Sequence, residues 1–190
     1  MLDLYDRHHA DLTAAVDCII RRSGRGLLID CHSFASRQLV YENPGENPDL
    51  RERERPDICI GTDPAWHTPA WLQDSLVKSF SGRRYTVVLN DPFSGTLVPM
   101  KYYQDGRLLS VMIEVNRKLY MDEETGEKTA GFETVRRDIT DAISELLDVS
   151  EGDELETRLI VCGGVDFNDY VFFKSQMDRL ITYYENIKLI

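Results

Sequence analysis

The segment that most constrains the fold is residues 26–34, where an aliphatic run ends in polar side chains. Residues 27–29 are consecutive aliphatics, which predicts a buried β-strand. Asp30, His32 and Ser33 follow at the C-terminal end of this strand. In open α/β sheets, ligands bind at that end of the strands. The segment therefore predicts an α/β fold with a functional site where this strand ends.

A second apolar segment, residues 109–117, places a carboxylate inside the predicted sheet. Strand alternation puts Glu114 on one face together with Met112 and Asn116. A buried carboxylate is costly unless it is paired, so an ion pair with Arg117 is one interpretation. The other is a general base with a tuned pKa. An imidazole and a carboxylate on two strands are the minimum requirement for metal-assisted hydrolysis.

His32 also has two interpretations. In the first it is a ligand of a divalent metal, with Asp30 or a backbone carbonyl supporting the ring, because metal-bound imidazoles usually need such a partner. In the second it is a strand-end histidine that is hydrogen-bonded to its neighbours. Spacing alone leaves both open.

The rest of the pattern alternates helices with strands, which predicts a sheet that is at least partly parallel. Gly24 is expected to cap one helix, and Thr68 and Pro69 are expected as the N-cap and first residue of another. The charge run at residues 51–55 is expected to be a solvated face, with a lid over the site as the alternative. The expected helices are residues 9–22, 68–80 and 131–147, and the expected strands are residues 27–31, 57–61, 85–89, 109–115 and 158–162.

The C-terminal region looks like the beginning of a second unit. Residues 148–156 are acidic and are expected to be a linker. The strand, glycine turn and helix that follow are typical of the first β-α-β of a Rossmann-like domain. Gly163, Gly164 and Asp166 are candidates for binding a nucleotide, with a simple tight turn as the alternative. Residues 157–190 are too few to bury a core of their own, so we expect the chain to end inside this domain.

Charge and composition exclude several classes of protein. The net charge is −11, whereas a nucleic-acid-binding surface is basic. No stretch approaches the roughly 18 apolar residues of a membrane span, and the acidic N-terminus does not resemble a signal peptide. The 4 cysteines have no CxxC spacing and are expected to be reduced and mostly buried. We therefore expect a cytoplasmic protein with no nucleic-acid or membrane partner.

Several motifs, in order along residues 1–147, resemble the N-formylglutamate amidohydrolase family. The resemblance implies a zinc-carboxypeptidase-like α/β fold, with a mixed sheet flanked by helices. It also implies cleavage of the amide of a small N-acyl amino acid. The motifs that carry it are residues 4–9, 28–34, 57–61, 90–99 and 113–122.

The same resemblance implies roles for particular residues. His32 is similar to a family ligand of zinc or another divalent metal, and Glu114 to the carboxylate that activates the metal-bound water. Arg117 and Asn116 would help to position the substrate. The loop at residues 90–96 alone favours an anion contact only weakly, since an ordinary turn fits equally well. Its substrate-binding residues, by resemblance, are Phe93, Ser94, Gly95 and Thr96.

This chain begins downstream of the family motifs that supply the other metal ligands. We therefore expect an N-terminally incomplete hydrolase domain, because a catalytic zinc takes about three protein ligands. The segment at residues 158–170 resembles the opening of a SLOG-superfamily domain of the YspA-like type, which implies a nucleotide-derived ligand. Val165 stands where that group usually has an arginine.

These observations predict a metal-dependent hydrolase of N-acyl amino acids such as N-formylglutamate, and they leave open whether this chain is active alone. The predicted organisation is a hydrolase domain at residues 1–147, a linker at 148–156 and the start of a SLOG-like domain at 157–190. The alternative is a non-catalytic nucleotide-sensing module on a degenerate hydrolase scaffold.

Overall fold

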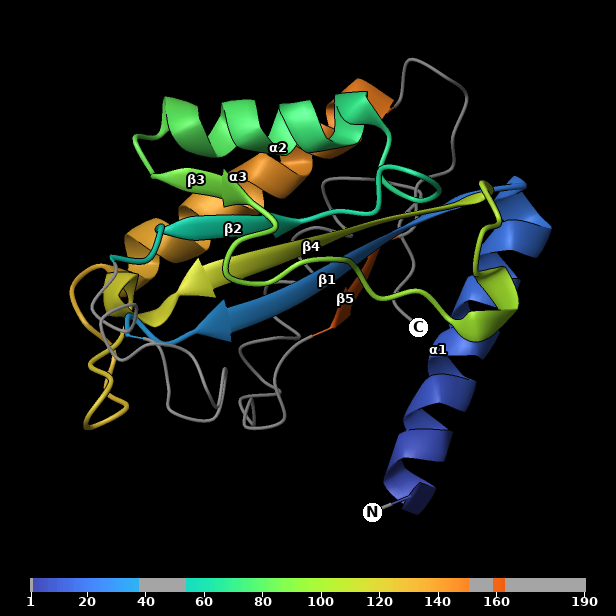
Figure 1. The fold of residues 1–190 in the computed structure, drawn as a ribbon, viewed down its shortest axis with the longest axis horizontal. Helices are drawn as coiled ribbons and strands as arrows, with labels where there is room; N and C mark the ends of the chain where they lie inside the picture. Colours follow the sequence, from blue (N-terminus) through green and yellow to red (C-terminus); the bar gives the residue numbers. More distant parts are fainter. Residues whose placement is uncertain (1, 38–53, 151–158, 163–190) are drawn as a thin grey trace.

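The strand predicted around His32 forms the centre of the sheet together with the strand that carries Glu114. In the computed structural model, which describes residues 2–37, 54–150 and 159–162, these two strands run parallel and pair along their whole length. Figure 1 shows the arrangement. The elements are α1 (Leu2–Ser23), β1 (Gly26–Phe34), β2 (Ile58–Gly61), α2 (Ala70–Gly82), β3 (Val87–Leu89), η2 (Met100–Tyr102), β4 (Leu108–Asn116), η3 (Arg117–Leu119), α3 (Phe132–Ser150) and β5 (Leu159–Cys162).

The sheet is mixed, as the sequence predicted. Its five strands follow the order β3-β2-β4-β1-β5. Strand β2 runs antiparallel to β4, whereas β3 is parallel to β2 and β5 is parallel to β1. The C-terminal ends of β1 and β4 therefore lie side by side at one end of the sheet, next to the first residue of β2.

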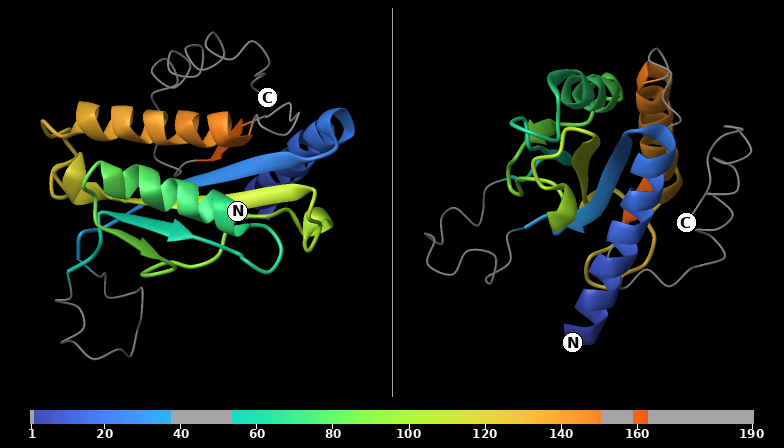
Figure 2. Two further views of the ribbon diagram at one scale, coloured as in Figure 1. Left: turned by 90° about the horizontal axis from the view of Figure 1, so that it is seen from above. Right: turned by 90° about the vertical axis from the view of Figure 1, so that its right-hand side faces the viewer.

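Helices α2 and α3 cover one face of the sheet, and α1 lies apart from them (Figure 2). The apolar residues of β1, β2 and β4 on that face form the main core with α2 and α3. A second cluster joins α1 to the first halves of β1 and β4. The second cluster consists of Leu12, Val16, Ile20, Leu28, Tyr102 and Leu108. The C-terminal ends of β1 and β4 lie outside this second cluster. Polar side chains can therefore occupy that end of the sheet on the face away from α2 and α3.

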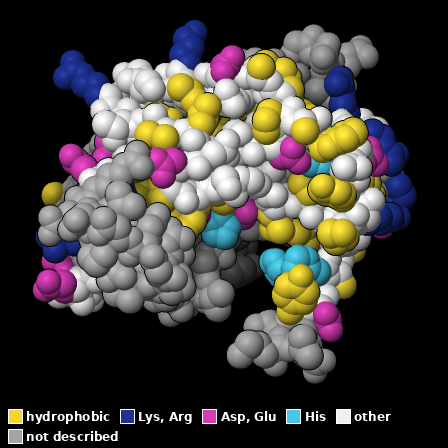
Figure 3. Space-filling view, viewed as in Figure 1, with side chains coloured by type: hydrophobic (Ala, Val, Ile, Leu, Met, Phe, Trp, Pro, Cys, Tyr) yellow, Lys and Arg dark blue, Asp and Glu magenta, His cyan; other side chains and the backbone are white. Residues whose placement is uncertain are grey.

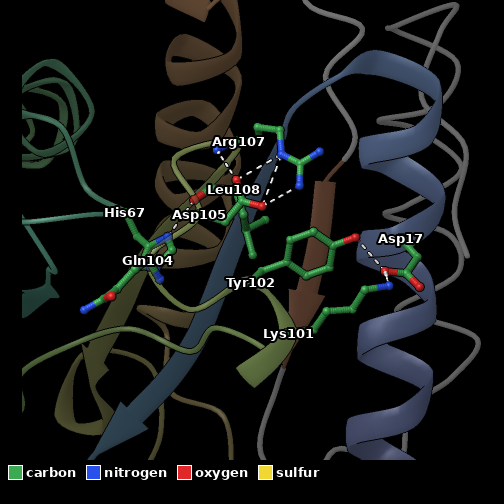
Figure 4. A network of polar contacts seen from close by, with 8 residues as sticks. All are labelled: Asp17, His67, Lys101, Tyr102, Gln104, Asp105, Arg107 and Leu108. Atoms are coloured by element: carbon green, nitrogen blue, oxygen red, sulfur yellow. Dashed lines mark hydrogen bonds and ion pairs between the residues drawn. The ribbon is translucent and has the colours of Figure 1, made fainter.

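A polar network fixes the end of the sheet farthest from His32 (Figure 4). The fully buried His67 contacts Leu108 O through Nδ1 at 2.7 Å, and the backbone N–H of Gln104 donates to its Nε2 at 3.2 Å. Tyr102 donates to Asp17 on α1 at 2.5 Å. Because both ring nitrogens of His67 are engaged with backbone, this histidine holds the η2 region against β4.

Several helix and strand limits differ from the expected ones. Helix α1 begins at Leu2 rather than at residue 9, and α3 continues to Ser150, into the expected linker. The expected buried strand at residues 85–89 is only β3, and its Val88 is 37% exposed. The burial prediction was wrong because β3 is an edge strand with a partner on one side only.

Thr68 does not cap α2, which corrects a second expectation. The N-cap position is Pro69, with no side-chain hydrogen bond. The Thr68 hydroxyl instead donates to Ser110 O at 2.6 Å and accepts from Asp63 N at 2.9 Å. Its side chain therefore joins the helix start to β4, a contact between segments far apart in the sequence. Gly24, by contrast, has φ +73° and donates to Ile20 O, as expected of a helix C-cap.

The strand expected to open a second domain lies in this same sheet. Strand β5 pairs with residues 27–30 of β1. Most of the second unit lies outside the described residues, so the domain division stays a prediction. The candidate nucleotide-binding residues Gly163, Gly164 and Asp166 lie there too. No helix in the described ranges is both long and apolar enough to cross a membrane.

Candidate active site

Three side chains on neighbouring strands form a row at the end of the sheet where β1 and β4 end and β2 begins. His32 pairs with Glu114 on β4, and Glu114 pairs with Cys59 on β2. Directly paired residues point to the same side of a sheet, so the row lies on the face away from α2 and α3. Figure 3 shows a hollow on this side of the molecule, between α1 and the second half of β1, with histidine side chains on two of its sides.

Asp30 contacts His32, and it is one of the two partners that the sequence left open for this ring. The distance from His32 Nε2 to Asp30 Oδ1 is 2.8 Å. The Asp30 carboxylate is buried, whereas the His32 side chain is 44% exposed. This contact is the main reason that the pKa of His32 is raised, partly against the effect of burial. Because Nε2 lies against Asp30, Nδ1 is the ring nitrogen that remains for a ligand of His32.

Glu114 is buried, with 6% of its surface exposed. Burial raises its pKa to about 7, and the nearby Asp30 charge adds to this, while His32, Arg117 and Arg55 act in the opposite direction. Its Oε2 atom is buried and has no hydrogen-bond partner among the described residues. A carboxyl group that titrates near neutral pH and keeps one oxygen unengaged is suited to accept a proton from water.

Arg117 follows β4 at the start of η3. No ion pair within 4 Å joins it to Glu114 in the part of the chain that the structure describes, so the ion-pair interpretation of Glu114 is wrong. The Nε atom of Arg117 is buried and lacks a hydrogen-bond partner within the described ranges. Arg117 therefore adds positive charge near Glu114 without neutralising it directly.

Asn116 is fully buried, and both ends of its amide contact backbone. Its Nδ2 donates to Pro56 O at 2.9 Å, and its Oδ1 accepts from Lys118 N at 3.2 Å. Asn116 thus shapes the backbone around Glu114. Its predicted contact with substrate stays a prediction.

The loop after β3 is tied to the sheet beside this row. Asn90 has φ +57°, and its Oδ1 accepts from Thr62 N at 2.9 Å and from Gly95 N at 3.3 Å. A Cβ atom on Gly61 would lie 2.3 Å from Gly95 O, so β2 and the loop are packed backbone to backbone. Thr96 Oγ1 is 2.6 Å from Ser110 Oγ on β4. The loop that carries Phe93, Ser94, Gly95 and Thr96 is therefore packed against β2 and β4, and its predicted contact with substrate stays a prediction.

Sequence reasoning missed two residues of this site. Arg55 was expected on a solvated face, but it is 9% exposed, whereas its neighbour Glu54 is 92% exposed at the side chain. Cys59 was expected only to be a buried thiol; its Sγ donates to Phe93 O at 3.2 Å, and burial raises its pKa. Neither role follows from a local pattern, because both contacts join segments that are distant in the sequence.

The described residues do not complete a metal site. Among them, no three His, Cys, Asp or Glu side chains lie close enough together to hold an ion. The predicted ligand His32 has suitable chemistry, and its Asp30 contact is the usual support for a metal-bound imidazole. A full set of three protein ligands is absent from this part of the chain.

Comparison with known proteins identifies the family of this chain. A family profile described as N-formylglutamate amidohydrolase matches residues 1–121. The chain therefore belongs to the N-formylglutamate amidohydrolase family. No match was found among curated proteins.

Two solved structures are similar to this chain. The N-formylglutamate amidohydrolase from Ralstonia eutropha JMP134 is 28% identical, with a TM-score of 0.62. The gene product Atu2144 from Agrobacterium tumefaciens is 20% identical, with a TM-score of 0.47. Each match covers 77% of this chain and 50% of the other. The chain thus spans half the length of these solved relatives.

Proposed function

We propose that this site hydrolyses the amide bond of an N-acyl amino acid such as N-formylglutamate. The observation that carries the proposal is Glu114, a buried carboxyl with a pKa of about 7 and an unengaged oxygen, next to His32 at the ends of two parallel strands. Membership of the amidohydrolase family supports the same chemistry.

Glu114 would serve as both base and acid. As a carboxylate it accepts a proton from the water that attacks the acyl carbon, and a tetrahedral intermediate forms. When the C–N bond breaks, the protonated Glu114 returns the proton to the leaving amine. Arg117, and the loop at residues 93–96, would hold the substrate so that its acyl carbon faces this carboxyl.

Zinc, or another divalent ion, is the cofactor that we propose for the complete site, with His32 as one ligand. Such an ion polarises a carbonyl and lowers the pKa of a bound water. Because the described residues do not complete its ligand set, no step above depends on it. The alternative, a nucleotide-sensing module, rests on residues 163–166, which lie outside the described ranges.

The test is release of free amine from N-formylglutamate, measured for the wild-type chain and for Glu114→Gln. General acid–base catalysis contributes about 10²- to 10⁴-fold, so we expect a loss of that size in kcat. Glu145→Gln is the control, because Glu145 pairs with Arg83 on the helical side of the sheet. Turnover that survives unchanged in Glu114→Gln removes this residue from its proposed role.

A further inference from the structure

Phe93 is anchored to two strands on the face of the sheet away from α2 and α3. Its backbone carbonyl accepts a hydrogen bond from the Cys59 thiol on β2, with Sγ and O 3.2 Å apart. Its ring centroid lies 6.0 Å from that of Phe34 on β1, a distance typical of a favourable aromatic pair. The Cζ atom of Arg55 lies within 6 Å of both ring centroids. Phe93 is thus fixed both by its backbone and by its ring.

These anchors place Phe93 across β4, because β4 lies between β2 and β1 in the sheet. Cys59 is the cross-strand neighbour of Glu114, and Phe34 is the cross-strand neighbour of Asn116. A residue that reaches from Cys59 on β2 to Phe34 on β1 therefore passes over β4 at the level of Glu114. The Phe93 side chain lies next to the proposed catalytic carboxyl.

The burial of the neighbouring residues agrees with this crossing. Glu114 is 6% exposed, and Phe34, Cys59 and Asn116 are at most 1% exposed, although α2 and α3 lie on the opposite face. The His32 side chain, in the same row on β1, is 44% exposed. Because the row is covered at Phe93 and exposed at His32, a substrate reaches Glu114 from the His32 side and has the Phe93 ring in front of it.

The position of this ring matters for the acyl group of a substrate. For Glu114 to accept a proton from the attacking water, the carboxyl oxygen, the water and the acyl carbon must be about 3 Å from one another in turn. The substituent on the acyl carbon, a hydrogen atom in formyl and a methyl group in acetyl, then lies close to the side chains that flank Glu114. A ring that is fixed by two strands does not move away without cost, so one added methyl group is a steric conflict.

Resting on the proposed function, we propose that the Phe93 ring sets the size of the acyl group, so that the site accepts formyl and excludes acetyl and larger groups. The contacts with Cys59 and Phe34 hold the ring in place for this purpose. The substrate class is thereby narrowed from N-acyl amino acids to N-formyl amino acids.

The experiment measures acyl preference with three substrates. Wild type, Phe93→Ala and Phe93→Leu are assayed for release of glutamate from N-formyl-, N-acetyl- and N-propionylglutamate. The measured quantity is the ratio of kcat/KM between substrates, because a variant that is only less stable loses activity on all three in proportion. Tyr103→Ala is the control, since Tyr103 is an aromatic residue, 56% exposed, that follows η2. Circular dichroism confirms that each variant is folded, and Phe93→Leu replaces the alanine variant if that variant does not fold.

We expect the wild type to prefer N-formylglutamate over N-acetylglutamate by at least about 10-fold, as for one methyl group in a fixed pocket. Phe93→Ala should reduce this preference by at least about 10-fold, and Phe93→Leu by a smaller factor, because leucine is intermediate in size. Tyr103→Ala should keep the whole preference. A preference that is unchanged in the folded Phe93 variants, even with lower rates on all substrates, overturns the proposal, as does a wild type that hydrolyses the three compounds equally well.

Failure of the proposed function is recognised separately. If the wild type hydrolyses none of the three compounds, the catalytic proposal fails, and binding of each compound is measured by calorimetry. Binding that favours N-formylglutamate by at least about 10-fold in the wild type and in Tyr103→Ala, but not in the folded Phe93 variant, supports the acyl-size proposal on its own. Equal binding of the three compounds by the wild type, a preference that survives in the Phe93 variant, or no binding overturns it.

Discussion

Replacing Glu114 by glutamine should stabilise the fold at alkaline pH, although the same change should remove activity. Burial raises the pKa of Glu114 to about 7, from an ordinary value of 4.5. Above that pH, the folded protein must hold a buried negative charge, whereas the unfolded chain exposes it to water. Glutamine has nearly the same shape and carries no charge, so it avoids this penalty.

The direction and the size of this stability change follow from proton binding at Glu114. Between pH 4.5 and about 7 the folded state binds more protons at Glu114 than the unfolded state does, so wild-type stability falls as the pH rises. Above about pH 7 the penalty is constant. A pKa of about 7 in place of 4.5 corresponds to about 3 kcal/mol. Contact with solvent at the site screens part of this, which leaves about 2 kcal/mol.

The assay is urea unfolding of wild type and Glu114→Gln at pH 5 and pH 8.5, in the presence of a chelator. Tryptophan fluorescence reports the transition through Trp66 and Trp71. The measured quantity is the difference in unfolding free energy between the two proteins. We expect it to shift in favour of the glutamine variant by about 2 kcal/mol from pH 5 to pH 8.5. A constant cost of burying the amide cancels in this comparison.

Glu145→Gln is the matched control. Its hydrogen bonds with Arg83 and Ser79 lower the pKa of Glu145, so its replacement should not stabilise the protein at pH 8.5. If the stability difference between wild type and Glu114→Gln is the same at both pH values, Glu114 titrates normally and the argument for a tuned base is refuted.

Two further predictions concern the loop packed against β2 and the metal. Gly61→Ala should destabilise the fold by about 1–3 kcal/mol in thermal unfolding, because the new methyl group would lie 2.3 Å from Gly95 O; a Tm equal to that of wild type would show that the loop moves away freely. His32→Ala should reduce zinc bound per chain, measured by mass spectrometry after dialysis against zinc, whereas His67→Ala should not, because both ring nitrogens of His67 contact backbone. Equal zinc content in wild type and His32→Ala would exclude His32 as a ligand.

The predicted strands around His32 and Glu114 were confirmed because their signal is local. A run of consecutive aliphatic residues is typical of a strand that is buried on both faces, so neighbouring residues alone predict these strands. The limits of other elements were less well predicted. The residues around Thr68 predict that it is a helix N-cap. Its hydroxyl instead donates to the carbonyl of Ser110, which lies 42 residues further along the chain.

By itself, the sequence determined that His32 and Glu114 would stand at the ends of buried strands, since hydrophobic periodicity depends only on neighbouring residues. Only the tertiary structure decided that these strands are adjacent and in register, so that the two side chains pair directly. It also decided that Arg55 is buried, with its Cζ atom within 6 Å of the ring centroids of Phe34 and Phe93. The reason is physical: the pKa of a carboxyl group and the position of a buried charge depend on what surrounds them in space, and distant segments supply those surroundings.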